Sequence, residues 1–132
     1  MYRLVYMSTP THSLSSAEIS AILATATRNN DRNEITGILI QDGKRLLQYL
    51  EGSQEKVEET FARIASDSRH HAIFRLKSGI IDRRQFPGWS MASKTVDEAR
   101  SLTEVVKELV KDCDREVAAE LLKFAEARDR AV

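Results

Sequence analysis

The sequence predicts an α+β fold of the ferredoxin-like class, with two helices on one face of a five-stranded mixed sheet. Two observations carry this prediction. Segments with the two-residue period of a strand alternate with segments that have the 3.6-residue period of an amphipathic helix. Their order is strand, helix, strand, strand, helix, strand, strand (βαββαββ), which is the order of a split β-α-β unit.

Residues 2–8 form the first predicted strand. Leu4 and Tyr6 share one face of this strand, and Val5 and Met7 share the other. Both faces are apolar, as they are again at Leu47 and Tyr49 of the third strand. The sheet therefore needs a second layer on the face away from the two helices.

The first helix is predicted to begin at Ser15, because Ser15 and Glu18 form a Ser-x-x-Glu capping box. Its core-facing stripe consists of Ile19, Ile22, Leu23 and Ala26. The polar run 29–33 is rich in residues that favour turns, so we expect the helix to end near Arg28.

Residues 34–41 and 46–52 read as the second and third strands, joined by Asp42-Gly43, a strong hairpin signal. The second helix begins at Gly52-Ser53. Its inward stripe includes Val57, Phe61 and Ile64. Residues 72–81 form a fourth strand, and Gly88-Trp89-Ser90-Met91 begins a fifth after the Phe86-Pro87 turn.

Residues 96–132 contain two amphipathic stretches that supply the second layer. The first is built on Val105, Val106, Leu109 and Val110, and the second on Val117, Leu121, Leu122, Phe124 and Ala125. Two interpretations stay open for this segment. It is a packing layer over the sheet, a docking surface, or both at once.

Composition excludes several classes of function. Twenty basic residues balance twenty acidic ones, so no overall charge favours nucleic acid or a membrane surface as partner. The single cysteine, Cys113, excludes an intrachain disulfide framework. No apolar run approaches the roughly 20 residues of a membrane span, and no signal-peptide pattern opens the chain, so we expect a cytoplasmic location.

Gln48 is the most informative polar residue. It points the same way as Leu46 and Leu50, and a buried carboxamide without partners costs about 1–3 kcal/mol. The first and third strands are neighbours in this fold, so Tyr6 and Gln48 are expected to hydrogen-bond beneath the helices. Such a pair is either a satisfied core bond or part of a ligand site. Asn29 and Asn30 are likewise either a helix C-cap or ligands.

Enzyme and metal chemistry find little support. His70 and His71 are adjacent and do not share a helix face, and no second cluster completes a metal shell. No phosphate-binding loop or nucleophile elbow occurs. The basic pair Arg83-Arg84 is interpreted as solvated. We therefore predict no metal site and no enzymatic activity.

Five segments in register carry a family resemblance. They are Arg3-Leu4-Val5-Tyr6-Met7-Ser8; Arg28-Asn29-Asn30 with Ile35-Thr36-Gly37-Ile38-Leu39; Leu47-Gln48-Tyr49-Leu50-Glu51-Gly52; Arg63-Ile64 with Asp67-Ser68-Arg69-His70; and Phe86-Pro87-Gly88-Trp89-Ser90-Met91. Together they resemble the BLUF domain, a blue-light sensor that uses FAD. The resemblance covers residues 2–93, and the tail is similar to that of short members with two C-terminal helices and no cyclase or phosphodiesterase domain. It implies an FAD-binding photosensor core at 1–95 and a C-terminal cap and output segment at 96–132.

The resemblance implies an isoalloxazine ring between the two core helices, edge-on to Tyr6 and Gln48. Asn30 would bond the C4 carbonyl and N3 region of the ring, which Ile22 and Ile64 would sandwich. The full set of implied cofactor-binding residues is Tyr6, Ile22, Asn29, Asn30, Leu39, Leu46, Gln48, Arg63, Ile64, Asp67 and His70. Leu46 stands where the family often has an aromatic residue.

The implied photochemistry starts with electron and proton transfer from Tyr6 to the excited flavin. Gln48 then rotates or tautomerises, and its altered hydrogen bond gives a red-shifted signalling state. Trp89 and Met91, alternate residues of one strand, are the further implied photoactive residues that relay the change. The output would pass to a separate effector protein, and we expect a dimer or larger homo-oligomer. Two rival hypotheses are a ferredoxin-like interaction module without a chromophore, and a flavin-dependent or hydrolytic enzyme.

Overall fold

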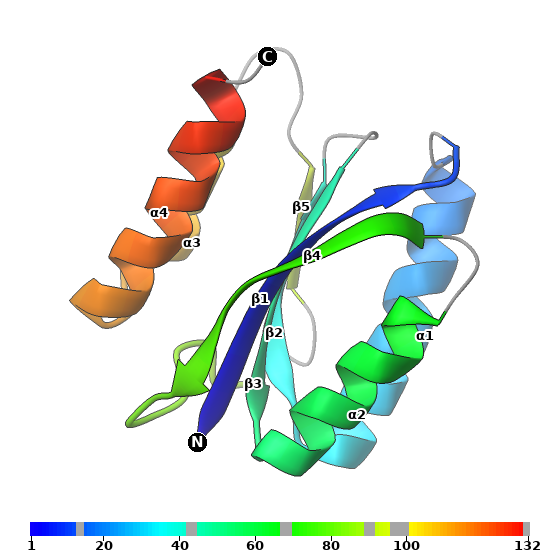
Figure 1. Cartoon of the computed structure of the whole chain (residues 1–132), viewed down its shortest axis with the longest axis horizontal. Coiled ribbons are helices and arrows are strands. Elements are labelled where there is room, and N and C mark those ends of the chain that lie inside the picture. Colours follow the sequence, from blue (N-terminus) through cyan, green and yellow to red (C-terminus); the bar gives the residue numbers. More distant parts are fainter. Residues whose placement is uncertain (13–14, 42–44, 67–69, 89–91, 96–100, 131–132) are drawn as a thin grey trace.

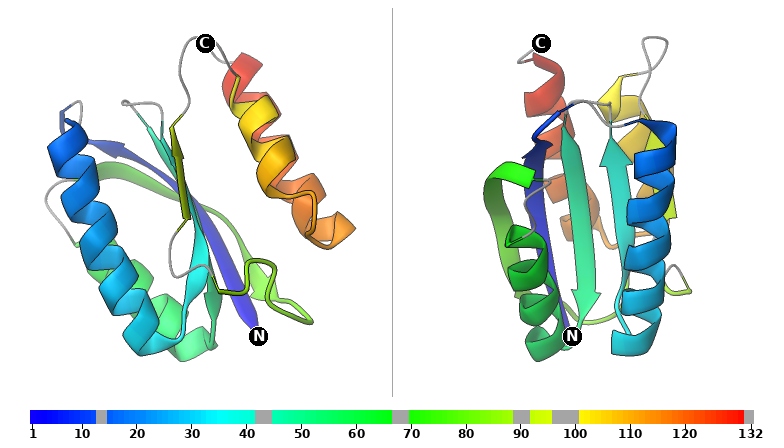
Figure 2. Two further views of the ribbon diagram at one scale, coloured as in Figure 1. Left: turned by 180° about the vertical axis from the view of Figure 1, so that it is seen from behind. Right: turned by 90° about the vertical axis from the view of Figure 1, so that its right-hand side faces the viewer.

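A twisted β-sheet separates two pairs of helices, α1 with α2 on one face and α3 with α4 on the other (Figures 1 and 2). The computed structural model describes residues 1–12, 15–41, 45–66, 70–88, 92–95 and 101–130, and at 70–72, 92–95 and 128 the backbone alone. The elements are β1 (Tyr2–Pro10), α1 (Ser16–Asn33), β2 (Thr36–Gln41), β3 (Leu46–Gly52), α2 (Gln54–Ala65), β4 (His70–Ile80), β5 (Ala92–Thr95), α3 (Leu102–Leu109) and α4 (Arg115–Arg130). The predicted α+β class is confirmed.

The strands follow the order β4-β1-β3-β2-β5. The pairs β1–β3, β1–β4 and β2–β3 are antiparallel, and β5 lies parallel to β2. The close pairing of β2 with β3 needs Gly37, because a Cβ there would collide with the backbone carbonyl of Tyr49. The expected fifth strand begins at Ala92 rather than at Gly88, whose φ of 81° is left-handed and incompatible with a strand. The predicted turn at Asp42-Gly43, and Trp89 and Met91, lie outside the described residues.

Helix α1 begins where its capping box predicts. The Ser15 hydroxyl accepts from the Glu18 backbone N–H, and the Glu18 carboxylate accepts from the Ser15 N–H, both at 3.1 Å. The same logic starts α2, where the Ser53 side chain accepts from the backbone N–H of Lys56. These local signals are readable without tertiary structure because both partners lie within one turn.

The end of α1 differs from the prediction. The helix continues through the polar run to Asn33, and Glu34 caps it in the left-handed conformation, with φ 57°. The expected end near Arg28 is therefore wrong, and the cap is Glu34 rather than an asparagine. Helix propensities separate these residues from alanine by only about 0.7 kcal/mol each. A tertiary contact fixes the end instead, because Arg84 Nη2 donates to the Glu34 carbonyl at 2.6 Å.

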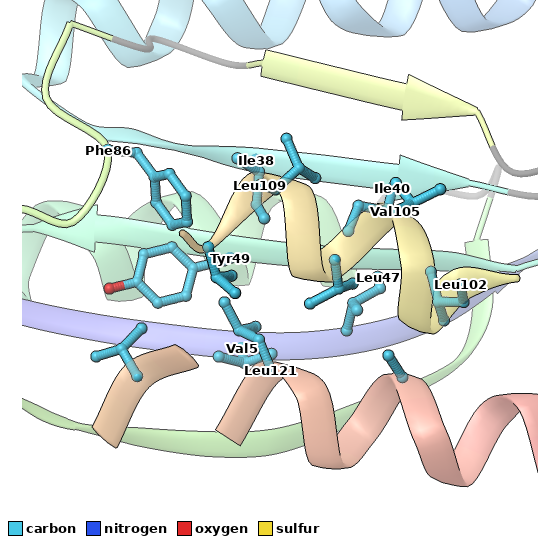
Figure 3. Packing of buried hydrophobic residues seen from close by; sticks show 14 of the residues in the cluster. Val5, Ile38, Ile40, Leu47, Tyr49, Phe86, Leu102, Val105, Leu109 and Leu121 are labelled. Carbon is cyan, nitrogen blue, oxygen red and sulfur yellow. The ribbon is translucent and has the colours of Figure 1, made fainter. Parts of the chain in front are cut away.

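The face of the sheet away from α1 and α2 carries the larger apolar core (Figure 3). Val5, Leu47 and Tyr49 point from the sheet toward α3 and α4, as the strand alternation predicts. The helical layer contributes Leu102, Val105, Val106, Leu109, Val110, Val117, Leu121 and Ala125, all buried. Each large side chain contributes about 1.5–3 kcal/mol on burial. The interpretation of the C-terminal segment as a packing layer is therefore confirmed.

A buried carboxylate ties the segment after β4 to the sheet. Glu51 on β3 is 0% exposed. One of its oxygens accepts from the Tyr49 hydroxyl at 3.0 Å and the Gln85 N–H at 2.8 Å. The other accepts from the Thr36 hydroxyl at 2.7 Å and the Phe86 N–H at 2.8 Å. All four partners donate, which is the pattern of an ionised carboxylate.

Glu51 was not singled out by sequence reasoning. A glutamate at the end of an apolar strand is a weak signal, because its partners come from a segment far along the chain.

The same segment also binds the turn between α3 and α4. The Gln85 side chain accepts from the Asp114 N–H at 2.6 Å and donates to the Asp114 carboxylate at 3.0 Å. Arg83 forms an ion pair with the same carboxylate, at 2.6 Å. Arg84 donates to Thr36 and to the Glu34 carbonyl, so the expectation that this basic pair is solvated is wrong for Arg84. The segment thus joins β3 to the C-terminal layer.

A second buried charge lies between β1 and α4. Arg3 is 4% exposed, and its Nη2 donates to Glu120 Oε1 at 2.7 Å. Arg3 Nε and Nη1 have no hydrogen-bond partner among the residues that the structure describes. A buried pair of this kind recovers little of its desolvation cost.

We expect the double variant Arg3→Met/Glu120→Leu to be at least as stable as the wild type, by up to about 1–4 kcal/mol. Two apolar side chains of similar length remove the unpaired donors and extend the surrounding core. Glu120→Leu should lose the most stability, because it leaves the buried Arg3 without its acceptor. Arg3→Met should lose less, because Glu120 is 17% exposed and keeps Lys77 at 4.0 Å. Urea unfolding of all four proteins measures this cycle. A double variant less stable than both single variants would contradict the assignment.

No helix in the described ranges is long and apolar enough to cross a bilayer.

Candidate functional site

Tyr6 and Gln48 form the polar centre of the sheet face beneath α1 and α2. They are directly opposite each other in the β1–β3 register. Tyr6 is 1% and Gln48 7% exposed, and the Tyr6 hydroxyl donates a hydrogen bond to Gln48 Oε1. The predicted bond between these two side chains is confirmed. Because the amide oxygen accepts from Tyr6, the amide nitrogen supplies donors in the other direction.

Burial controls the chemistry of the phenol. Desolvation raises the pKa of Tyr6 far above its ordinary value, so the phenol is neutral at any physiological pH. The neutral phenol therefore keeps its proton, which it donates to the Gln48 oxygen.

A pocket opens between α1 and α2 above this pair. It is lined by Ile22, Thr25, Ala26, Asn29, Asn30, Leu39, Leu46, Gln48, Thr60, Arg63 and Ile64. Its apolar side chains are Ile22 and Ala26 from α1, Ile64 from α2, and Leu39 and Leu46 from the sheet. Most of the side chains predicted to bind a cofactor are thus brought to one cavity from four separate elements. Tyr6 is not part of the lining and lies behind Gln48.

Three lining residues were not predicted, namely Thr25, Ala26 and Thr60. Ala26 lay on the predicted apolar stripe of the first helix, which was assigned to the core. Thr60 lies one turn from Val57 and Ile64 on α2, and a buried threonine on such a stripe is a usable signal. The side chains of Asp67 and His70, also predicted, lie outside the described part of the chain.

The apolar stripe of α1 is incompletely covered. Ile19, Ile22, Leu23 and Ala26 are each only half-buried, and Asn30 is the only buried residue of this described helix. Most helix stability in proteins comes from packing of an apolar face. Ile22 and Ala26 of this stripe line the pocket, so a flat apolar ligand there would complete their packing.

Polar groups gather at one side of the pocket. Asn30 is 2% exposed, while Asn29 beside it is half-buried. With Gln48 they offer amide donors and acceptors, which suit a ligand edge that carries both carbonyl and N–H groups. Arg63 is exposed and close to Thr60 Oγ1, with Nη2 at 3.5 Å, so it supplies positive charge beside the pocket. An apolar ring with one polar edge and an anionic tail fits this set of side chains, and an isoalloxazine ring with its phosphates has these features.

Among the described residues, no three His, Cys, Asp or Glu side chains lie close enough together to hold a metal ion. Cys113 is half-buried between α3 and α4, and burial raises the pKa of its thiol to about 11. A thiol with a raised pKa is a poor nucleophile at neutral pH.

Comparisons with known proteins point to one family. The family model "Sensors of blue-light using FAD" matches residues 1–92. The photoactivated adenylate cyclase subunit beta of Euglena gracilis is 32% identical over 112 residues, which are 82% of this chain and 13% of that protein. The chain therefore spans about an eighth of the length of this relative.

Two solved structures have the same fold over nearly the whole chain. The dark-state structure of the BLUF protein BlrB has a TM-score of 0.75 and 31% identity, with 96% of each chain covered. The structure of Klebsiella pneumoniae BlrP1 in a manganese/cyclic-diGMP complex has a TM-score of 0.82 and 26% identity, covering 98% of this chain and 33% of BlrP1. The likeness to BlrB includes the C-terminal helical layer.

Proposed function

Because the chain belongs to the family of blue-light sensors that use FAD, we propose that it is a photoreceptor that binds FAD non-covalently between α1 and α2. The observation that carries the proposal is the pocket above the Tyr6–Gln48 pair. Ile22 and Ala26 of α1 line this pocket and are only half-buried. The family is one of sensors, and we propose no enzymatic activity for this chain. The ferredoxin-like arrangement belongs to the same proposal, supported by the sheet order.

The lining supports a definite orientation for the ring. Ile22 and Ile64 stand on the two helices and would sandwich it, with Leu39 and Leu46 against its inner edge. The amides of Asn29, Asn30 and Gln48 would bond its polar edge. Arg63 would meet the ribityl chain or the phosphates, and Asp67 and His70 complete the proposed binding set.

A bound flavin would supply the light absorption and would accept an electron. Tyr6 is the proposed donor, and its burial couples electron loss to proton loss along the hydrogen bond to Gln48. Gln48 carries a donor and an acceptor on one rotatable amide. Rotation or tautomerisation of this amide would change its hydrogen bond to the ring and so shift the absorption to the red.

The output is proposed to leave through the C-terminal part of the chain. Trp89 and Met91 follow the 81–88 segment, which Glu51 and Gln85 fasten to β3 and to the α3–α4 turn. One rearranged hydrogen bond supplies about 0.5–1.5 kcal/mol, whereas moving an equilibrium from 1:99 to 99:1 needs about 5.5 kcal/mol. We therefore propose a modest population shift, amplified by a homo-oligomer and read by a separate effector protein.

An absorption spectrum before and after blue illumination tests the proposal. The protein with FAD should be yellow, and blue light should move its visible band to the red, reversibly in the dark. FAD at 100 times its dissociation constant should also stabilise the fold by about 2.7 kcal/mol, because it binds only the folded state. A protein that stays colourless after reconstitution with FAD would favour the interaction module, and a band that does not move would end the photoreceptor proposal.

A further inference from the structure

A second aromatic ring fixes the position of the Tyr6 ring. Phe61 on α2 packs edge-to-face against Tyr6, with ring centroids 5.2 Å apart and planes at 69°. Tyr6 is fully buried, whereas Phe61 is half-buried and belongs to the same cluster beneath the helices. Edge-to-face contacts have a preferred geometry, so the Phe61 ring restricts the tilt of the phenol.

The Phe61 ring is also contacted by an exposed cationic side chain, that of Arg75. Arg75 lies opposite Tyr6 in the β1–β4 register, and its guanidinium stands 5.1 Å from the centre of the Phe61 ring. A cation over an aromatic face is attracted by the ring quadrupole. The Phe61 ring therefore contacts two side chains, the Tyr6 ring in the edge-to-face pair and the Arg75 guanidinium over its face.

Arg75 is fixed by a two-point ion pair. Its Nη1 donates to Glu58 Oε1 at 2.9 Å and its Nη2 to Glu58 Oε2 at 2.7 Å. The Tyr2 hydroxyl donates to the same Glu58 oxygen at 2.5 Å. Two parallel bonds orient the guanidinium plane more firmly than a single contact. The hydrogen bond from Arg75 is the main reason that the pKa of Glu58 is lowered, with the Tyr2 bond second.

We propose that Phe61, clamped by Arg75 and Glu58, is a positioning residue that orients the Tyr6 phenol toward Gln48. The inference rests on the proposed function for its consequence, since the geometry of the Tyr6–Gln48 bond would govern how fast the light state returns. A looser phenol samples more orientations of this bond. It therefore exchanges its proton more readily and reverts faster.

The key variant is Phe61→Leu, which removes the ring but keeps an apolar side chain. Phe61→Tyr is the conservative variant that keeps the ring. Phe74→Leu is the matched control, because Phe74 neighbours Arg75 on β4, is 63% exposed, and lies opposite Met7 on the other face. Arg75→Met tests the clamp from outside, because it retains the apolar stem without the guanidinium.

Two readouts keep this proposal separate from the photoreceptor proposal. The first is the exchange rate with water of the Tyr6 hydroxyl proton, measured by NMR on the FAD-loaded protein in the dark. The second is the rate of dark recovery after blue light. The interaction free energy of an aromatic pair corresponds to a factor of about 2 to 10 in a rate constant. We therefore expect Phe61→Leu to accelerate both rates by about that factor. Arg75→Met should have a smaller effect in the same direction, and Phe61→Tyr and Phe74→Leu should behave as the wild type.

An unchanged hydroxyl exchange rate in Phe61→Leu would overturn the positioning role, even if thermal stability falls. A wild type without any light-induced shift would overturn the photoreceptor proposal instead, and the hydroxyl exchange would still decide the role of Phe61. Equal acceleration in Phe74→Leu would also overturn the inference, because it would show a general loosening of the sheet edge.

Discussion

Tyr6→Phe is expected to keep FAD bound and to lose the red-shifted state altogether. The variant retains the ring that packs against Phe61, so the pocket keeps its shape. It lacks the hydroxyl whose proton is hydrogen-bonded to Gln48, and a phenyl ring is a far weaker electron donor than a phenol. Absorption spectra under blue light measure the outcome, and the flavin content confirms that the pocket is filled.

The same variant carries a stability cost that can be checked independently. Removing the hydroxyl leaves the buried Gln48 oxygen without this donor, which costs about 1–3 kcal/mol. Tyr49→Phe is the matched control, since Tyr49 neighbours Gln48 in sequence but points to the opposite face. It should keep the light response at full size. A normal light-induced shift in Tyr6→Phe would refute the assignment of Tyr6 as the donor.

Glu51→Leu is expected to destabilise the fold by more than about 4 kcal/mol, because four donors lose their acceptor. The N–H groups of Gln85 and Phe86 belong to the backbone and cannot turn toward water without moving the segment. Each unsatisfied buried donor costs about 1–3 kcal/mol, against a total stability of about 5–15 kcal/mol for a domain. Urea unfolding at neutral pH measures the loss.

Glu59→Leu is the matched control for Glu51→Leu. Glu59 is an exposed glutamate on α2 that lies 3.8 Å from Lys56 Nζ, so its replacement should change the free energy of unfolding by no more than about 0.5 kcal/mol. The loss of stability in Glu51→Gln should lie between those of Glu51→Leu and Glu59→Leu, because the amide keeps one acceptor oxygen. A loss below about 1 kcal/mol in Glu51→Leu would show that the 81–88 segment is held by other contacts.

Much of the site could be predicted because its signals are local. Strand alternation put Tyr6 on the face of Leu4, and put Gln48 on the face of Leu46 and Leu50. The order of elements made their two strands neighbours. The helix-start signals at Ser15 and Ser53 were also confirmed, since a cap and its partners lie within one turn.

The remaining site residues needed the fold. Thr60 lines the pocket, and its spacing from Val57 and Ile64 on α2 indicates an inward-facing residue without separating a pocket residue from a core residue. The end of α1 was missed because turn preferences are weak beside a contact such as that of Arg84 with the Glu34 carbonyl. Whether Asp67, His70, Trp89 and Met91 take their expected roles stays a prediction.

The sequence by itself determined the order of the strands and helices, where the first two helices begin, which faces are apolar, and that one phenol and one amide share a buried face. Only the tertiary structure decided which distant groups meet the buried charges, as in Glu51 with Gln85 and Arg3 with Glu120. Periodicity depends on backbone geometry over a few residues, whereas these contacts depend on strand register and loop path over the whole chain.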